Sequence, residues 1–282
     1  TLWTVILWLL LRALRTKRWL DFAWLGLAVG LTPYTYYSGW VLPFVAAAMA
    51  GYLLFVAWWT GRRKAPVPSG GMRLRRQVAG LMLAALLALL VVLPLAIHFY
   101  QNPDLLVGRL ANTADTEDTA QSLLQSVWSN TIATGAMFGP FGSAGDLRPV
   151  RNIPGEPVLS IWWAIPFYLG VVLSLWRLKR PAYGLLWIGL WGLALPGLIT
   201  ETAPHFTRIL GMVAPTVLFI AVGLDWIWSL PKIRRVPLRW AALLLLLLGG
   251  VFSARDYFVR WATIPDLDRA FFAPSYALGR AL

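Results

Sequence analysis

The chain has 282 residues, of which 59% are hydrophobic, 14% aromatic and 13% charged, and its mean hydropathy is +0.64. A typical soluble domain carries about 25% charged residues and a disordered chain is poor in apolar ones, so both classes are excluded. The formal charge of +13 suggests a nucleic-acid partner only in a soluble protein, so here the positions of the charges decide its meaning. The cysteine count is 0, which excludes disulfides and thiolate metal sites.

Eight apolar runs are candidates for membrane helices. A membrane helix needs about 20 mostly apolar residues, and these runs are apolar on all sides, unlike the amphipathic helices of a soluble core. In chain order they cover residues 1–14, 20–35, 38–60, 77–98, 159–176, 182–200, 209–230 and 238–254. The sequence therefore predicts an all-α, polytopic helical membrane protein with about eight transmembrane helices.

Basic residues concentrate in four of the connectors between these runs. They lie at 12–18, 62–76, 177–180 and 232–239. Together with the neighbouring Asp21 and Asp225, these connectors carry a net charge of roughly +15, whereas the other connectors and the C-terminal tail carry about −2. Because loops rich in Lys and Arg stay in the cytoplasm, we expect a multi-pass protein of the cell membrane. The expected partners are the bilayer and its anionic lipids, and not nucleic acid, since no folded basic domain accompanies the charges.

This orientation predicts four parts. Residues 1–97 hold four transmembrane helices with basic cytoplasmic loops, and one of these loops is a flexible linker at 61–76. Residues 98–158 form an extracytoplasmic loop, and residues 159–254 hold four more transmembrane helices. Residues 255–282 form an extracytoplasmic tail. Apolar side chains at helical spacing within 118–139 predict an amphipathic helix in the outer loop, resting on the membrane surface or capping a cavity. They are Leu123, Leu124, Val127, Trp128 and Ile132.

Motifs of soluble enzymes are nearly absent. The chain has no G-x-S-x-G elbow, Walker loop, H-E-x-x-H or paired-cysteine site, and no metal site is predicted. The stretch GLAVG (26–30) lies inside an apolar run, where small residues indicate close helix packing more than a nucleotide fingerprint.

The densest polar cluster is ETAPHFTR (201–208), between two apolar runs. Ionisable residues this close to hydrocarbon are costly and often functional. His205 and Arg208 would share one face if this stretch began the next helix, and Arg208 could then present its donor fork to a phosphate. The alternative is that Arg208 and Glu201 pair with each other or extend to water at the interface. Composition alone favours neither interpretation.

A second polar group lies in the loop 141–157, which is rich in turn formers. Its members are Asp146, Arg148, Arg151, Asn152 and Glu156. The functional interpretation is contact with sugar hydroxyls or phosphate, because loops on a rigid scaffold commonly carry sites. The alternative is a solvated turn network.

Four segments carry a family resemblance. They are GLAVGLTPYTYYSGWVLP (26–43), HFYQNPDLLVGRLANTA (98–114), GDLRPVRNIPGEPVLS (145–160) and ETAPHFTRILGMVAPTVLFIAVGLDW (201–226). In order and in expected topology, they resemble bacterial GT-C glycosyltransferases of the protein-mannosyltransferase-like and aminoarabinose-transferase-like kind. The resemblance covers most of the chain.

The resemblance implies a multi-span enzyme that uses a polyprenyl-phosphate-linked sugar donor at the extracytoplasmic face. An acceptor displaces the lipid phosphate with inversion, a carboxylate acts as base or positions a metal, and cationic side chains stabilise the departing phosphate. On this basis Arg208 and His205, with Glu201 beside them, belong to the donor-phosphate region. Asp146, Arg151 and Asn152 belong to the outer loop that closes over it.

The chain departs from the family at one important position. The family's catalytic acidic residues lie in the first outer loop, but here the first outer connector holds only YTYYSG. We therefore expect the catalytic loop to lie upstream of Thr1 and the chain alone to be inactive. No catalytic residue is assigned, and any divalent metal would be held by upstream residues.

Two other classes remain as alternatives. A transporter or flippase-like protein is disfavoured because no apolar run carries a mid-bilayer charge and no broken-helix pair recurs in two halves. The second alternative is a non-catalytic membrane scaffold, and it is disfavoured because such a protein has no need of the polar cluster 201–208.

Overall fold

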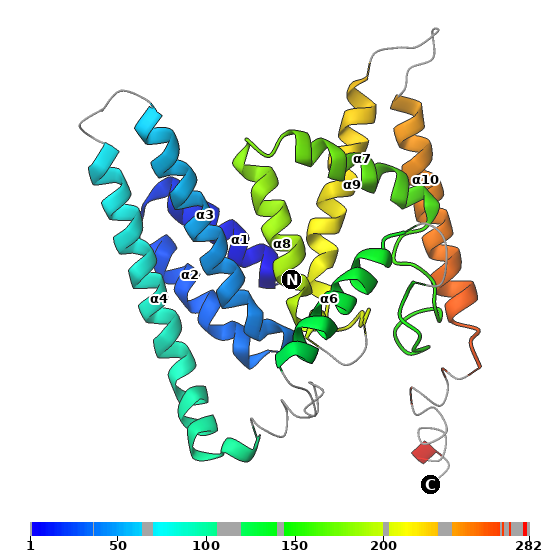
Figure 1. Cartoon of the computed structure of the whole chain (residues 1–282), viewed down its shortest axis with the longest axis horizontal. Helices are drawn as coiled ribbons and strands as arrows, with labels where there is room; N and C mark the ends of the chain where they lie inside the picture. Colours follow the sequence, from blue (N-terminus) through cyan, green and yellow to red (C-terminus); the bar gives the residue numbers. More distant parts are fainter. Residues whose placement is uncertain are drawn as a thin grey trace. The chain divides into compact units, whose positions relative to one another are not determined.

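The computed structural model of the chain describes residues 2–35, 37–63, 70–105, 120–139, 144–199, 203–230, 239–265, 267, 271 and 279–280, with the backbone alone at 37, 61–63, 70–73 and 120–123. These residues form helices and turns and contain no β-strand, so the all-α prediction is confirmed for them. The longer helices are α1 (Leu2–Thr16), α2 (Trp19–Leu31), α3 (Leu42–Arg63), α4 (Gly70–Gln101), α6 (Ala120–Ala136), α7 (Ile161–Trp176), α8 (Pro181–Leu198), α9 (Val213–Ser229) and α10 (Arg239–Arg255) (Figure 1). Short turns are η1 (Thr32–Tyr34), η2 (Tyr37–Val41), η3 (Leu210–Met212) and the π-helical η4 (Asp256–Trp261).

Within the described residues, five helical segments are long and apolar enough to cross a membrane. They are Ser38–Thr60, Leu74–Gln101, Pro181–Leu198, Leu210–Ser229 and Arg239–Trp261. They match five of the eight predicted runs, and much of their surface is exposed apolar side chain, as expected for helices dissolved in lipid. The chain is therefore a polytopic membrane protein.

The other three predicted spans form helices of fewer than 18 residues, so they are not among these five. The helix α1 has 15 residues, α2 has 13 and α7 has 16. The helix α1 ends before Lys17, whose φ of 57° reverses the chain, and α2 gives way to the turn η1 around Pro33.

The predicted linker at 61–76 is wrong in its extent. The helix α3 continues to Arg63 and α4 begins at Gly70, so helix covers much of the segment. The residues that follow Gly71 are Met, Leu, Arg and Gln, which are good helix formers, and their propensity outweighed the linker-like Gly and Pro nearby. Residues 64–69 lie outside the described part of the chain.

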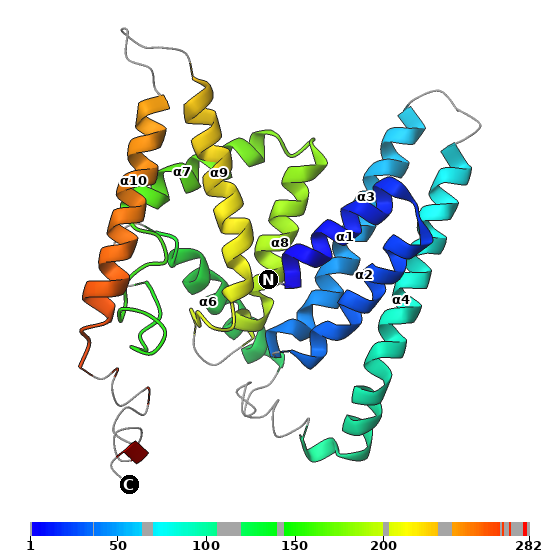
Figure 2. The same ribbon diagram turned by 180° about the vertical axis from the view of Figure 1, so that it is seen from behind.

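The chain divides into two compact units that are not continuous in sequence. Unit 1 comprises residues 1–117 and 178–196, and unit 2 comprises residues 118–177 and 197–282. In unit 1 the helices α1 and α2 form a hairpin, and α3 and α4 run antiparallel to each other (Figures 1 and 2). The helix α2 packs closely against α4.

Glycines bring α2 and α4 into near-backbone contact. A β-carbon on Gly26 would overlap the carbonyl oxygen of Ala84, and one on Gly30 would lie 2.7 Å from the β-carbon of Val91. In turn, Gly80 on α4 makes room for the ring of Phe22. The GLAVG stretch thus serves close helix packing, as its position in an apolar run predicts.

In unit 2 the helices α9 and α10 form an antiparallel pair, and α7 crosses α9 obliquely (Figures 1 and 2). The two crossing helices meet through one glycine each. A β-carbon on Gly170 of α7 would overlap the carbonyl oxygen of Phe219, and one on Gly223 of α9 would overlap that of Pro166. This backbone-to-backbone contact fixes α9 beneath the loop that precedes α7.

The predicted helix of the outer loop is present as α6. Its polar residues Asn130 and Thr134 are buried, and the Asn130 amide donates to the carbonyl oxygen of Leu198 at 2.9 Å. The apolar side chains Leu124, Trp128 and Ile132 are instead exposed along the opposite face. Asn130 therefore holds α6 to Leu198 within unit 2, and the helix exposes the apolar side chains of its opposite face.

Candidate functional site

The loop 144–158 is a closed turn held by its own backbone. The amide of Gly145 donates to the carbonyl oxygen of Gly155 at 3.1 Å, and the amide of Gly155 donates to that of Asp146 at 3.1 Å. Both glycines are required, since a β-carbon on Gly145 would overlap the carbonyl oxygen of Glu156 and Gly155 has a φ of 77°. The loop is thus an ordered scaffold for the polar residues that it carries.

Asp146 is the residue that joins the two polar segments singled out in the sequence. Its side chain is 3% exposed, and its Oδ2 accepts a hydrogen bond from the amide of Phe206 at 3.0 Å. The same carboxylate pairs with Nε of Arg151 at 3.1 Å and accepts from the amide of Arg148 at 3.0 Å through Oδ1. This satisfies the buried charge and docks the loop 144–158 onto the segment that contains His205.

His205 lies in the electrostatic field of this cluster, outside the membrane-spanning segments. Burial, followed by the positive charges of Arg151 and Arg208, lowers the pKa of His205 to about 4, while Asp146 acts in the opposite direction. The imidazole is therefore neutral at neutral pH. Its Nδ1 lies 3.1 Å from the hydroxyl of Thr207, which fixes the ring orientation.

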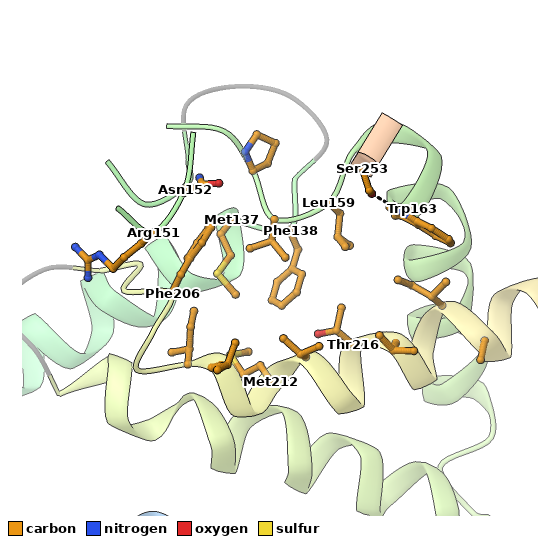
Figure 3. Close-up of a pocket in the computed structure, with 18 of the residues that line it drawn as sticks. Met137, Phe138, Arg151, Asn152, Leu159, Trp163, Phe206, Met212, Thr216 and Ser253 are labelled. Atoms are coloured by element: carbon orange, nitrogen blue, oxygen red, sulfur yellow. Dashed lines mark hydrogen bonds between the residues drawn. The ribbon is translucent and has the colours of Figure 1, made fainter. Parts of the chain in front are cut away.

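An apolar cavity of about 710 Å³ opens beside this cluster within unit 2 (Figure 3). Met212 at the end of η3 and Thr216 on α9 form one wall, and Phe138 and Leu159 face them. At one edge, beside Phe206, lie the polar side chains of Arg151 and Asn152, with the guanidinium of Arg151 turned away from the apolar middle. The cavity is therefore an apolar compartment with a polar edge next to the Asp146–Arg151 ion pair.

The end of the cavity opposite Arg151 is closed by a pair of residues from α7 and α10. The indole N–H of Trp163 donates to the hydroxyl of Ser253 at 3.0 Å (Figure 3). Gly249 allows this approach, because a β-carbon there would lie 2.5 Å from the Trp163 ring. The pair ties α10 to α7 and limits the depth of the cavity.

The residues of η4 that bind the loop 144–158 are not among those identified from the sequence. Arg260 pairs with Glu156 at 2.5 Å and with Asp256 at 3.1 Å, and the indole of Trp261 donates to the carbonyl oxygen of Pro149 at 2.7 Å. The spacing of four residues predicts the Asp256–Arg260 ion pair. No feature of the sequence predicts the bonds of Arg260 and Trp261 to the loop 144–158. The π-helical turn η4 therefore clamps the loop 144–158 from its outer side.

All of the predicted site residues except Glu201 lie in the described part of the chain. Asp146, Arg151, Asn152, His205 and Arg208 gather in one region, which is consistent with the interpretation that these two segments share a site. Arg151 and Asn152 line the cavity, and Asn152 also donates to the carbonyl oxygen of Glu156 at 2.7 Å. Glu201 lies outside the described residues, so its proposed pairing with Arg208 stays a prediction.

His205 and Arg208 do not begin the next helix, so the condition for a shared helix face is not met. The amides of Arg208 and Ile209 both donate to the carbonyl oxygen of His205, forming a turn, and α9 begins only at Val213. The turn still brings the two side chains into electrostatic contact.

No group of three or more His, Asp or Glu side chains that could hold a metal occurs in the part of the chain that the structure describes. Asp146 is a poor metal ligand in this arrangement, since its carboxylate is already shared among Arg151 and the amides of Arg148 and Phe206.

Comparisons with protein-family models, with curated proteins and with solved structures find no match to the chain. Function is therefore argued from the geometry of the site.

Proposed function

We propose that the chain is the membrane-embedded part of a glycosyltransferase that moves a sugar from a polyprenyl-phosphate-linked donor to an acceptor at the extracytoplasmic face. The observation that carries this proposal is an apolar cavity of about 710 Å³ with Arg151 and Asn152 at its edge and a second arginine, Arg208, close enough to act on His205. Such a compartment is complementary to a ligand with a long apolar chain and an anionic head.

The charges near this edge of the cavity support an anionic ligand. Arg151 and Arg208 contribute two positive charges, Asp146 contributes one negative charge, and His205 is held neutral. The guanidinium fork of arginine matches a phosphate in shape and charge, and burial strengthens the interaction. His205 and Asn152 add hydrogen-bonding groups without adding charge.

In the proposed reaction an acceptor hydroxyl attacks the anomeric carbon of the sugar. A C–O bond forms to the acceptor as the C–O bond to the lipid phosphate breaks, the hydroxyl proton passes to a base, and the phosphate leaves with the bonding electron pair. Arg151 and Arg208 would stabilise the negative charge that develops on this phosphate. Asp146 is a positioning residue, because its oxygens are occupied by the groups that it holds.

The membrane topology is part of the proposal. We infer about eight crossings, with α1, α2 and α7 completing theirs by means of the residues that flank them, since 16 helical residues span only about 24 Å of a core of about 30 Å. The basic connectors lie in the cytoplasm, whereas the loop 98–158 and the C-terminal tail lie outside. The exposed apolar face of α6 rests on the outer membrane surface.

The first test is binding of a radiolabelled polyprenyl phosphate to the purified chain in detergent. Arg208→Gln should weaken binding at least about tenfold, the effect of losing one charge-assisted hydrogen bond. Arg148→Gln is the matched control, because Arg148 is an exposed arginine of the loop 144–158 that, unlike Arg208, is not among the charges that shift the pKa of His205. Equal binding by the Arg208→Gln variant and the unchanged chain would contradict the site.

The second test separates a transferase from a flippase-like protein. The full-length protein is reconstituted in vesicles with a donor labelled in the sugar. Release of the sugar to an acceptor, lost in the Arg208→Gln variant, supports the transferase. Movement of intact donor across the bilayer without cleavage of the sugar–phosphate bond would overturn it in favour of the flippase.

A further inference from the structure

A second hollow, of about 400 Å³, lies at the turn between α1 and α2 in unit 1. Lys17, with its φ of 57°, reverses the chain there, so the last turns of α1 and the start of α2 face each other. The hollow is lined by Arg12 and Trp8 from α1, by Arg18 and Asp21 around the start of α2, and by apolar neighbours. It is unrelated to the cavity in unit 2.

The hollow carries one net positive charge. Asp21 is 4% exposed, and its carboxylate pairs with Nε of Arg12 at 2.9 Å and accepts from the hydroxyl of Thr16 at 2.5 Å. Both carboxylate oxygens of Asp21 therefore have a partner. Within the described residues, no hydrogen bond joins the two terminal nitrogens of Arg12 to the protein, and the guanidinium of Arg18 makes none either. The two guanidinium groups at this hollow can donate hydrogen bonds to one anionic oxygen group, such as a phosphate.

The rim of the hollow is apolar and exposed. The exposed fractions are 55% for Trp8, 60% for Trp24 and 73% for Leu20. Trp8 also lies 5.0 Å from the guanidinium carbon of Arg12, which keeps this cation beside an indole ring. Indole rings prefer the depth of lipid headgroups, so the rim indicates a ligand that is itself embedded in the membrane.

We propose that this hollow binds one anionic phospholipid, with its phosphodiester between Arg12 and Arg18 and its acyl chains against Trp8 and Trp24. A soluble phosphate would match the two arginines but would leave the exposed indoles and Leu20 without a partner. Basic pockets between membrane helices recognise anionic headgroups by this combination of charge and apolar wall. The proposal does not depend on the function proposed for the cavity in unit 2.

The test is native mass spectrometry of the purified chain titrated with phosphatidylglycerol. We expect Arg18→Gln to weaken binding of the first lipid about five- to tenfold, because one charge-assisted contact is lost at a partly exposed site. Arg18 is exposed and its side chain makes no described bond, so the variant should fold. Trp24→Leu, which preserves apolarity but removes the indole, should weaken binding about two- to threefold.

Arg15→Gln is the matched control, since Arg15 is an exposed arginine at the same helix end that does not line the hollow. It should bind phosphatidylglycerol like the unchanged chain. Equal weakening by Arg15→Gln and Arg18→Gln would overturn the proposal in favour of general surface charge. Binding of phosphatidylcholine as tight as that of phosphatidylglycerol, or of glycerol 3-phosphate as tight as that of the lipid, would also overturn it.

Discussion

The carboxylate of Asp146 illustrates how a buried charge can organise a site without taking part in chemistry. It links residues 60 positions apart by accepting the amide hydrogen of Phe206, while Arg151 neutralises it at 3.1 Å. Removing one partner from such a buried pair leaves an uncompensated charge, which costs more than the pair itself contributes. The role of Asp146 therefore differs from that of Arg208, which can be removed without exposing a buried partner among the described residues.

The pKa of His205 reports the charge of the site. Since the pKa is about 4 in the folded chain and 6.5 in a free histidine, the unfolded chain binds more protons between these values. Above pH 6.5 His205 is neutral in both the folded and the unfolded chain, so it does not reduce the free energy of unfolding. As the pH falls from 6.5 through 4, the unfolded chain is protonated first and the free energy of unfolding decreases.

Arg208→Gln should raise the pKa of His205, because one of the positive charges that disfavour protonation is removed. Asp146→Asn should move the pKa in the opposite direction. The measurement is NMR titration of the chain labelled at histidine, which contains only 2 histidines. The His98→Gln variant assigns the signals, and an unchanged His205 titration in the Arg208→Gln variant would show that the two side chains do not interact.

At the scale of elements, the contact between α7 and α9 depends on the absence of two side chains. Gly170 and Gly223 let the backbones touch, and α9 supplies one wall of the cavity while the loop before α7 supplies another. Without a hydrophobic driving force between helices in lipid, such close packing is a main source of association.

Gly223→Ala should destabilise the chain by about 1–3 kcal/mol, because its β-carbon overlaps the carbonyl oxygen of Pro166 and backbone must shift. Gly250→Ala is the control, since a β-carbon there meets nothing within 4 Å and alanine favours helix by up to about 1 kcal/mol. Thermal unfolding in detergent, followed by circular dichroism, measures both. A melting temperature that falls equally in the two variants would refute the packing argument.

At the scale of the whole molecule, the proposed orientation depends on the charge asymmetry of the connectors. Lys179 lies in a basic connector and Arg148 in the loop 144–158, and both are exposed. If the positive connectors are cytoplasmic, these two residues lie on opposite sides of the membrane.

The chain contains no cysteine, so single cysteines can be introduced directly. In intact cells a membrane-impermeant maleimide should label Arg148→Cys but not Lys179→Cys, because only the outer loop is accessible. Permeabilised cells, in which both variants should react, provide the control. Labelling of Lys179→Cys alone in intact cells would reverse the orientation.

The sequence by itself determined the all-helical membrane character, because apolar runs of this length leave the backbone no other way to satisfy its hydrogen bonds in lipid. It also located the polar residues of the outer loop and the function of GLAVG. Helix ends were less predictable. The arginines after Met72 were predicted to lie in a linker but extend α4, because local helix propensity outweighs the nearby Gly and Pro. His205 lies in a turn, so it does not share a helix face with Arg208.

Only the tertiary structure decided which polar residues meet. The hydrogen bond from Phe206 to Asp146, the clamp of Arg260 and Trp261 on the loop 144–158, and the apolar cavity beside Arg151 all join segments far apart in the chain. Hydrophobicity and periodicity depend on near neighbours along the sequence and so predict elements. Contacts between distant residues depend on how helices cross, which here follows from Gly170 and Gly223 as much as from any polar group.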